Sequence, residues 1–406
     1  MLSGKYKKLT NEEQEFLKSW LDRLPTVESH YCRSAVAYQS KKFLYPGATI
    51  RQLHRDYSKA AEEAQNRPVS FPTFCGIFHK ENYSVFIPRK DQCDACVSFK
   101  YGNISQEEYV EHCRLKDEAR SEKKKDTESV SEKKSVWTMD LQAVLLCPRS
   151  KASSMYYKTK LQVHNFTLFE ASSKDGYCYV WNESEGDLSS EVFAYLQYSH
   201  FEKVLKKDTR IEEIVIWSDG CGYQNRNTTV SNAFSALARE YKVTITQKYL
   251  VAGHTQMECD SMHSVIERNI SADVFTERDY VVVMEHARKK PSPYHVTSLK
   301  HENFHKMDKL FFNSIRPGKK PGDATVHSLR GLQYKADGNV HFKLSFSEDT
   351  DWQLLPQRIQ ALQEWEWIPL FPAQLPITLR KYQDLQSMKK VMPVDCHHFF
   401  DSLPHV

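Results

Sequence analysis

The longer, C-terminal part of the chain opens with three strand-like segments and then alternates between helices and strands. Apolar and aromatic stretches separated by turn-forming residues predict strands at 136–146, 156–169 and 177–181. The pattern then predicts a helix from about 189, a strand at 214–217, a helix at 230–241, a strand at 243–250 and a helix from about 258. This order predicts an α/β fold, a mixed sheet with helices on its faces.

The same order is that of the ribonuclease H (RNase H) fold, whose catalytic carboxylates come from the first strand, the fourth strand and a late helix. Asp140 lies within the first strand, Asp219 follows the fourth, and Asp260 lies in the late helix. An Asp inside a strand is costly unless it is paired or binds a metal. Asp219 alone could equally be a turn or capping residue. Glu267 shares a helix face with Asp260, so both remain candidates for the third acid.

Three acids from distant parts of the chain can bind one or two Mg²⁺ or Mn²⁺ ions, because hard cations prefer oxygen ligands. Such a site would activate a water or a 3′-hydroxyl and stabilise the leaving oxygen of a phosphodiester. We therefore expect metal-dependent cleavage or transfer of DNA strands. His254 or His263 is a candidate for assisting proton transfer.

The N-terminal part of the sequence is predicted to be helical. Apolar residues at helical spacing predict helices at about 11–24 and 49–65, and a third that Ser70 would cap. The second and third helices would suit a helix-turn-helix DNA reader. An ordinary helical hairpin is the alternative.

A zinc site is predicted from the two thiols of Cys93-x-x-Cys96, which supply half of a tetrahedral site. The preferred ligand set adds His112 and the distant His30. Cys75 with His79 is a competing pair, and buried thiols without a metal are the other alternative.

Charge and composition divide the chain into four parts. Residues 1–113 would form a helical domain with helix-turn-helix-like and zinc-binding features, and the highly charged residues 114–135 an exposed linker. Residues 136–290 would form the RNase H-like core. Residues 291–406 would form a C-terminal module with strands at 331–335 and 340–346.

Several classes of protein fit the sequence poorly. It has no apolar run long enough to cross a bilayer, its first residues lack the apolar segment of a secretory signal, and it contains no phosphate-binding glycine motif. We therefore expect an intracellular protein without a membrane partner or a nucleotide cofactor. The net charge of +4 permits a nucleic-acid partner without demanding one.

Several motifs resemble an uncharacterised transposon-derived animal family with an RNase H-like core. They are Trp137–Pro148, Ser218-Asp219-Gly220-Cys221, the stretch from Gly253-His254-Thr255 to His263, His30-Tyr31-Cys32-Arg33, Cys93–Cys96 and Lys381–Leu385, which together span about residues 28–403.

This resemblance implies the ancestry of a DDE-type transposase (one with three catalytic acids) and carries the acidic roles onto Asp140, Asp219 and Asp260. It implies DNA as the partner, and with it nuclear residence and a homo-oligomer as expectations. Domesticated copies of such transposons often keep the fold while losing transposition. A catalytically inactive DNA- or chromatin-binding protein is therefore the alternative.

Overall fold

The computed structural model describes residues 9–24, 26–27, 41–44, 49–85, 93–308, 311–356 and 366–406. It divides the chain into two compact units, Met1–Gln92 and Cys93–Val406. We expected the first domain to end at residue 113. The division falls about twenty residues earlier, because the two helices that follow Cys93 belong to the second unit.

The first unit contains the three helices that the apolar spacing predicted. They are α1 (Asn11–Asp22), α3 (Ile50–Glu63) and α4 (Phe71–Lys80), and the side chains of Thr10, Thr49 and Ser70 cap their N-termini. Leu17, Leu21, Tyr57, Phe74 and Phe78 form their common core. Strands β1 (Thr26–Val27), β2 (Lys42–Leu44) and β3 (Tyr83–Val85) make a small sheet.

The helix pair α3 and α4 does not have the usual connection of a helix-turn-helix. Residues 64–70 join the two helices, whereas the turn in such DNA readers has about three or four residues. DNA binding by this pair therefore stays a prediction.

The second unit is built on a mixed sheet. Its strands are β4 (Lys134–Leu141), β5 (Leu145–Cys147), β6 (Leu161–Glu170), β7 (Gly176–Asn182), β8 (Glu213–Ser218), β9 (Thr244–Tyr249), β10 (His295–Ser298), β11 (Gly331–Tyr334), β12 (Val340–Lys343) and β13 (Gln353–Leu354). The central order is β7-β6-β4-β8-β9, in which β6 is antiparallel to its neighbours and β8 is parallel to β4 and β9. This arrangement is RNase H-like and confirms the predicted fold class.

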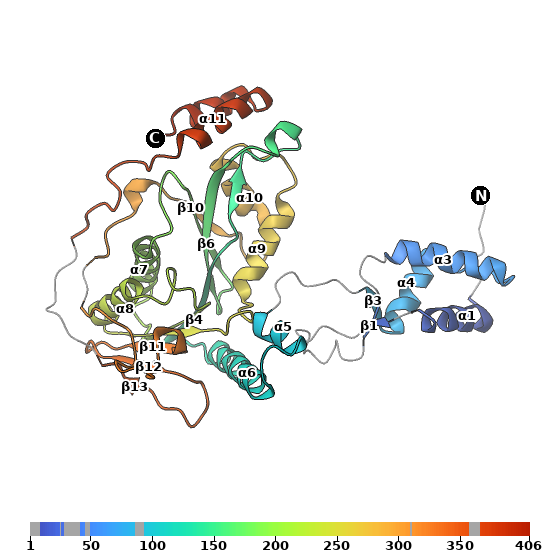
Figure 1. The fold of residues 1–406 in the computed structure, drawn as a ribbon, viewed down its shortest axis with the longest axis horizontal. Coiled ribbons are helices and arrows are strands. Elements are labelled where there is room, and N and C mark those ends of the chain that lie inside the picture. Colours follow the sequence, from blue (N-terminus) through green and yellow to red (C-terminus); the bar gives the residue numbers. More distant parts are fainter. Residues whose placement is uncertain are drawn as a thin grey trace. The chain divides into compact units, whose positions relative to one another are not determined.

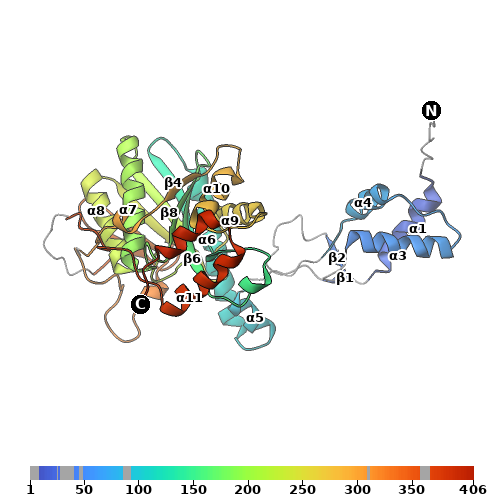
Figure 2. The same ribbon diagram turned by 90° about the horizontal axis from the view of Figure 1, so that it is seen from above.

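Helices cover both faces of this sheet (Figure 1). On one face α7 (Ser190–Lys207) and α8 (Thr228–Tyr241) lie side by side (Figures 1 and 2) and share a core with Trp137, Met139 and Ile216. On the other face α9 (Glu258–Asn269) and α10 (Glu277–Ala287) pack against Val163, Cys178 and Val180. None of the helices in the described ranges is long and apolar enough to span a bilayer.

The C-terminal residues extend the central sheet and do not form a sheet of their own. Strands β11 and β12 lie within the expected ranges 331–335 and 340–346, but β11 pairs with β9, and β12 and β13 follow outward. At the opposite edge β10 pairs with β7. Two short helices, α11 (Leu379–Met388) and α12 (His397–Asp401), complete the unit.

The structure differs from the expected exposed linker at 114–135. Here α5 (Asp94–Lys100) is followed by α6 (Gln106–Glu128), and β4 begins soon afterwards at Lys134. The buried carboxylate of Asp126 in α6 accepts hydrogen bonds from Trp217 Nε1 (2.9 Å) and Lys248 Nζ (2.7 Å). Because α6 contacts the core partly through buried charges, a search for an apolar face misses it.

Removing this buried carboxylate tests the contact. We expect Asp126→Ala to lower the free energy of unfolding by about 3 kcal/mol, because Trp217 Nε1 would lose its buried acceptor and Lys248 Nζ would keep only Glu122 of its two carboxylate partners. Urea unfolding of the full chain, followed by tryptophan fluorescence, measures the loss. The control Asp117→Ala removes a largely exposed carboxylate of the same helix and should change stability by less than about 0.5 kcal/mol. Equal effects of the two changes would contradict the described contact.

Candidate functional site

The pairing of β4 with β8 places Asp140 beside Asp219. In this parallel pair Val136 lies opposite Val215 and Thr138 opposite Trp217. Continued two residues beyond this paired region, the same register would place Asp140 opposite Asp219, and the charge of Asp219 does act on the Asp140 carboxyl. Because side chains alternate along a strand, both carboxylates lie on the face that α9 covers.

Asp260 reaches the same place from the first turn of α9. Its neighbour Cys259 packs under the sheet, with Sγ 3.6 Å from Thr138 Oγ1 and 3.7 Å from the carbonyl oxygen of Thr167. Thr138 is two residues before Asp140 on β4. The start of α9 therefore lies next to the strand that carries the first acid.

The electrostatics of Asp140 reflect this grouping. Burial, together with the negative charges of Asp219 and Asp260, raises the pKa of its carboxyl to about 7. A cation between the three carboxylates would offset this repulsion. Such a perturbed acid is typical of functional sites.

Hydrogen bonds orient each of the three carboxylates. Asp219 Oδ1 accepts from Asn225 Nδ2 (2.7 Å) and from the backbone N–H of Cys221 (3.2 Å). Asp260 Oδ2 accepts from the backbone N–H of Met257 (2.7 Å), and Asp140 Oδ1 accepts from that of Leu141 (2.9 Å). These donors restrict the side-chain rotamers without supplying a balancing positive charge.

Glu267 and His263 occupy different surroundings. Glu267 is exposed, and its Oε1 lies 3.5 Å from Gln142 Nε2. It follows Asp260 by seven residues, which is about 10 Å along the axis of α9. Buried His263 has Nε2 2.8 Å from Thr167 Oγ1, and burial lowers its pKa to about 4. The charge of Asp260 acts on the Asp140 carboxyl, whereas the hydrogen bond of Glu267 is with Gln142. The choice of Asp260 as the third acid stays a prediction.

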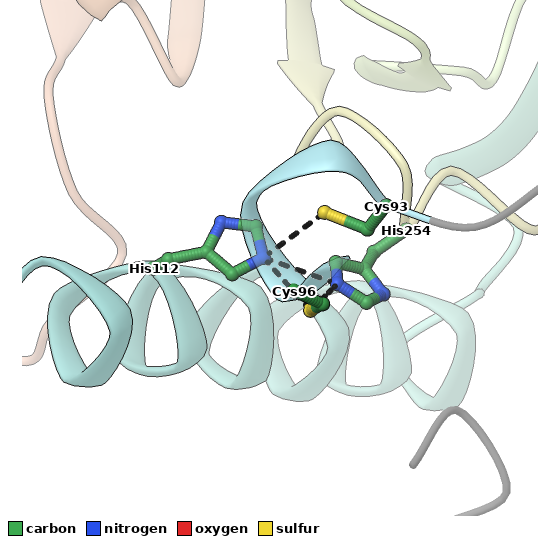
Figure 3. A group of neighbouring side chains, drawn as sticks. All are labelled: Cys93, Cys96, His112 and His254. Carbon is green, nitrogen blue, oxygen red and sulfur yellow. Dashed lines mark hydrogen bonds between the residues drawn. The ribbon is translucent and has the colours of Figure 1, made fainter. Parts of the chain in front are cut away.

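A second constellation, of two thiols and two imidazoles, lies at the junction of α5, α6 and the loop before α9. Figure 3 shows Cys93, Cys96, His112 and His254 pointing toward one another. Cys93 precedes α5, Cys96 lies within it, His112 comes from α6, and His254 comes from the loop between β9 and α9. Their ligand atoms all lie within 4.8 Å of one another.

The spacing of these atoms fits a tetrahedral metal site. The two Nε2 atoms are 3.1 Å apart, and the described sulfur–nitrogen distances are 3.3, 3.4 and 3.5 Å. With zinc–nitrogen bonds of about 2.0 Å and zinc–sulfur bonds of about 2.3 Å, a tetrahedral site has a nitrogen–nitrogen distance of about 3.3 Å and nitrogen–sulfur distances of about 3.5 Å. Burial lowers the pKa of His254 to about 4, which keeps this imidazole neutral. The cluster can bind a metal such as zinc.

The cluster overlaps the predicted ligand set in Cys93, Cys96 and His112. The predicted fourth ligand, His30, lies outside the described residues. In the structure His254 completes the group, although it lies 142 residues after His112. No spacing rule links residues so far apart in the sequence. The signal that could have pointed to His254 is its position directly after Gly253 in the loop before α9. The competing pair, Cys75 and His79, lies on α4 in the first unit.

Gly253 allows the loop to approach Cys93. Its φ of +75° lies in the left-handed region, and a Cβ there would come within 2.6 Å of Cys93 Cβ and 2.7 Å of Cys93 Cα. Cys93 Sγ is also 3.6 Å from the carbonyl oxygen of Ala252. The position of His254 therefore depends on a residue without a side chain next to it.

Part of the chain matches a known family model. Residues 124–316 match the family model described as a domain of unknown function (DUF8701). A comparison with curated protein sequences finds no match. Among solved structures, the chain is similar to one in the crystal structure of a pre-cleavage Mos1 transpososome, with 7% identity and a TM-score of 0.24 over 58% of this chain and 68% of that one.

A pair of glycine substitutions tests the packing of the loop against Cys93. Gly253→Ala should cost about 1–2 kcal/mol for its left-handed backbone and more for the overlap with Cys93, and metal content should fall. The control Gly102→Ala has the same φ of +75° but no atom within 4 Å of the added Cβ. It should show the backbone cost alone. Thermal unfolding and metal analysis measure both effects, and equal results for the two variants would contradict the close packing.

Proposed function

We propose that this chain is a transposase-derived protein that binds DNA and cleaves or transfers DNA strands with the carboxylates of Asp140, Asp219 and Asp260. The observation that carries the proposal is the grouping of these acids, two at adjacent strands of an RNase H-like sheet and one in the first turn of the helix α9 beside them. The sequence resemblance to a transposon-derived family points the same way. Nuclear residence belongs to the proposal, because the substrate is found there.

The three side chains have the chemistry that a divalent cation requires. Carboxylate oxygens are the preferred ligands of Mg²⁺ and Mn²⁺, and the mutual repulsion at Asp140 would be relieved by positive charge. Bound there, such cations would activate a water or a 3′-hydroxyl and stabilise the leaving oxygen of a phosphodiester. Asn225 and the Cys221 N–H would hold the Asp219 carboxylate in one orientation throughout.

Nicking of supercoiled DNA in the presence of Mg²⁺ or Mn²⁺ tests the catalytic part. Asp219→Asn should lower the cleavage rate by about 100-fold or more, because the amide supplies no negative charge to a cation. The control Asp349→Asn changes an exposed carboxylate in a loop and should cleave like the wild type. Asp260→Asn should lose activity and Glu267→Gln should keep it.

The other outcomes of the nicking assay are equally informative. Cleavage that persists in Asp219→Asn would come from another source and would contradict the proposal. If neither protein cleaves while both retard DNA in a gel, the chain is the catalytically inactive DNA-binding protein. Loss of activity in Glu267→Gln alone would move the third role to Glu267.

The cysteine–histidine cluster is proposed to hold a structural Zn²⁺. Two thiolates and two imidazoles form a common closed zinc site. We expect about one zinc per chain in protein purified without added metal, and a large loss of zinc in Cys96→Ser. The control Cys75→Ser changes a thiol in the first unit and should leave zinc content unchanged. Elemental analysis decides, and wild-type protein with less than about a tenth of a zinc per chain would reject the site.

A further inference from the structure

We propose that the metal in the cysteine–histidine cluster positions Asp260, and so sets the affinity of the three carboxylates for their divalent cation. The inference rests on the proposed function in one respect, because it requires a cation at Asp140, Asp219 and Asp260. It assigns to the cluster a role beyond holding helices together. His254 would act as a positioning residue for the carboxylate site.

One short segment of the chain carries both a ligand of the cluster and the proposed third acid. His254 lies six residues before Asp260, between the end of β9 at Tyr249 and the start of α9 at Glu258. Local hydrogen bonds stiffen this segment, since the His254 N–H donates to the Val251 carbonyl (2.9 Å) and the Met257 N–H donates to Asp260 Oδ2 (2.7 Å). A displacement of His254 would therefore be transmitted to the first turn of α9.

A bound metal would be the main link between this segment and the helices α5 and α6. The facing atoms in the cluster are two imidazole nitrogens 3.1 Å apart and two sulfur atoms. Sulfur forms only weak hydrogen bonds with the imidazole nitrogens. Metal–ligand bonds to all four would be far stronger. Gly253 packs against Cys93, and Cys93 Sγ lies 3.6 Å from the Ala252 carbonyl oxygen, a weak hydrogen bond compared with a metal–ligand bond.

Helix α6 is itself held firmly to the sheet and can support the start of α9. Asp126 binds the buried Trp217 and Lys248 of the sheet, so the C-terminal half of α6 cannot shift freely. Lys123 of the same helix forms an ion pair with Glu258, two residues before Asp260, with Nζ–Oε distances of 2.7 Å. This pair is partly exposed and weak by itself. The start of α9 is thus held to α6 at two points, and the metal would supply the stronger one.

The test measures Mn²⁺ binding and backbone motion in the full chain rather than activity. Free Mn²⁺ is followed by electron paramagnetic resonance in zinc-loaded wild type, and Asp140→Asn identifies the binding that belongs to the carboxylates. We expect His254→Ala to weaken this binding by about 10- to 100-fold and to speed hydrogen exchange in residues 250–262. His254→Cys, which keeps a metal ligand, should restore both values.

Three controls keep structural damage apart from positioning. His286→Ala removes an exposed imidazole on α10 and should leave Mn²⁺ binding unchanged. Lys123→Met removes the second link and should weaken binding less than His254→Ala. If His254→Ala does not fold, zinc is instead removed from folded wild type with 1,10-phenanthroline and then restored. Exchange in 250–262 should rise and fall with the zinc.

The possible failures are distinguishable. If Mn²⁺ binds in a manner that Asp140→Asn abolishes, yet His254→Ala and zinc removal change neither affinity nor exchange, the coupling is overturned and the carboxylate site stands. If wild type binds no Mn²⁺ that Asp140→Asn abolishes, the carboxylate cation site fails and the coupling falls with it. Failure of His254→Cys to restore a folded protein's affinity would also count against a role through the metal.

Discussion

The parallel pairing of β4 with β8 at the centre of the sheet determines where the other elements and the acids can lie. Along these strands Trp137, Met139 and Ile216 face α7 and α8, whereas Thr138 and Trp217 face α9 and α6. This alternation divides the interior into separate cores. It also turns Asp140 and Asp219 to the same side, and a slip of one residue in either strand would send one acid to the opposite face. The register therefore fixes both the packing of the helices and the grouping of the acids.

The predictable parts of the structure are those that depend on local pattern. The core strands and helices follow their apolar periodicity, and Asp140 and Asp219 stand out because one lies inside a strand and the other directly follows one. Cys93 and Cys96 stand out through their close spacing. In each case the residues that identify the feature are near one another in the chain, so short-range rules suffice.

The parts that could not be predicted depend on contacts between distant residues. Residues 114–128 have the composition of a solvated segment, and their contacts with distant residues, above all the pairing of Asp126 with Lys248 and Trp217, show why they are ordered. His254 joins the cluster from a loop far along the chain, with no spacing that announces it. The strands after residue 330 are predictable, but their attachment to β9 is not, because a strand does not encode its neighbour in its own pattern.

Strands from the C-terminal part of the chain cover both edges of the central sheet. Without β10 and β11, the strands β7 and β9 would be sheet edges with rows of unpaired N–H and C=O groups. The outermost strands that replace them are short, with four residues in β10 and two in β13. Short edges offer little template for pairing with another molecule. A chain cut before His295 would therefore keep all three acids but expose β7 and β9 as unpaired edge strands. Such a chain would be prone to aggregate by pairing with other molecules.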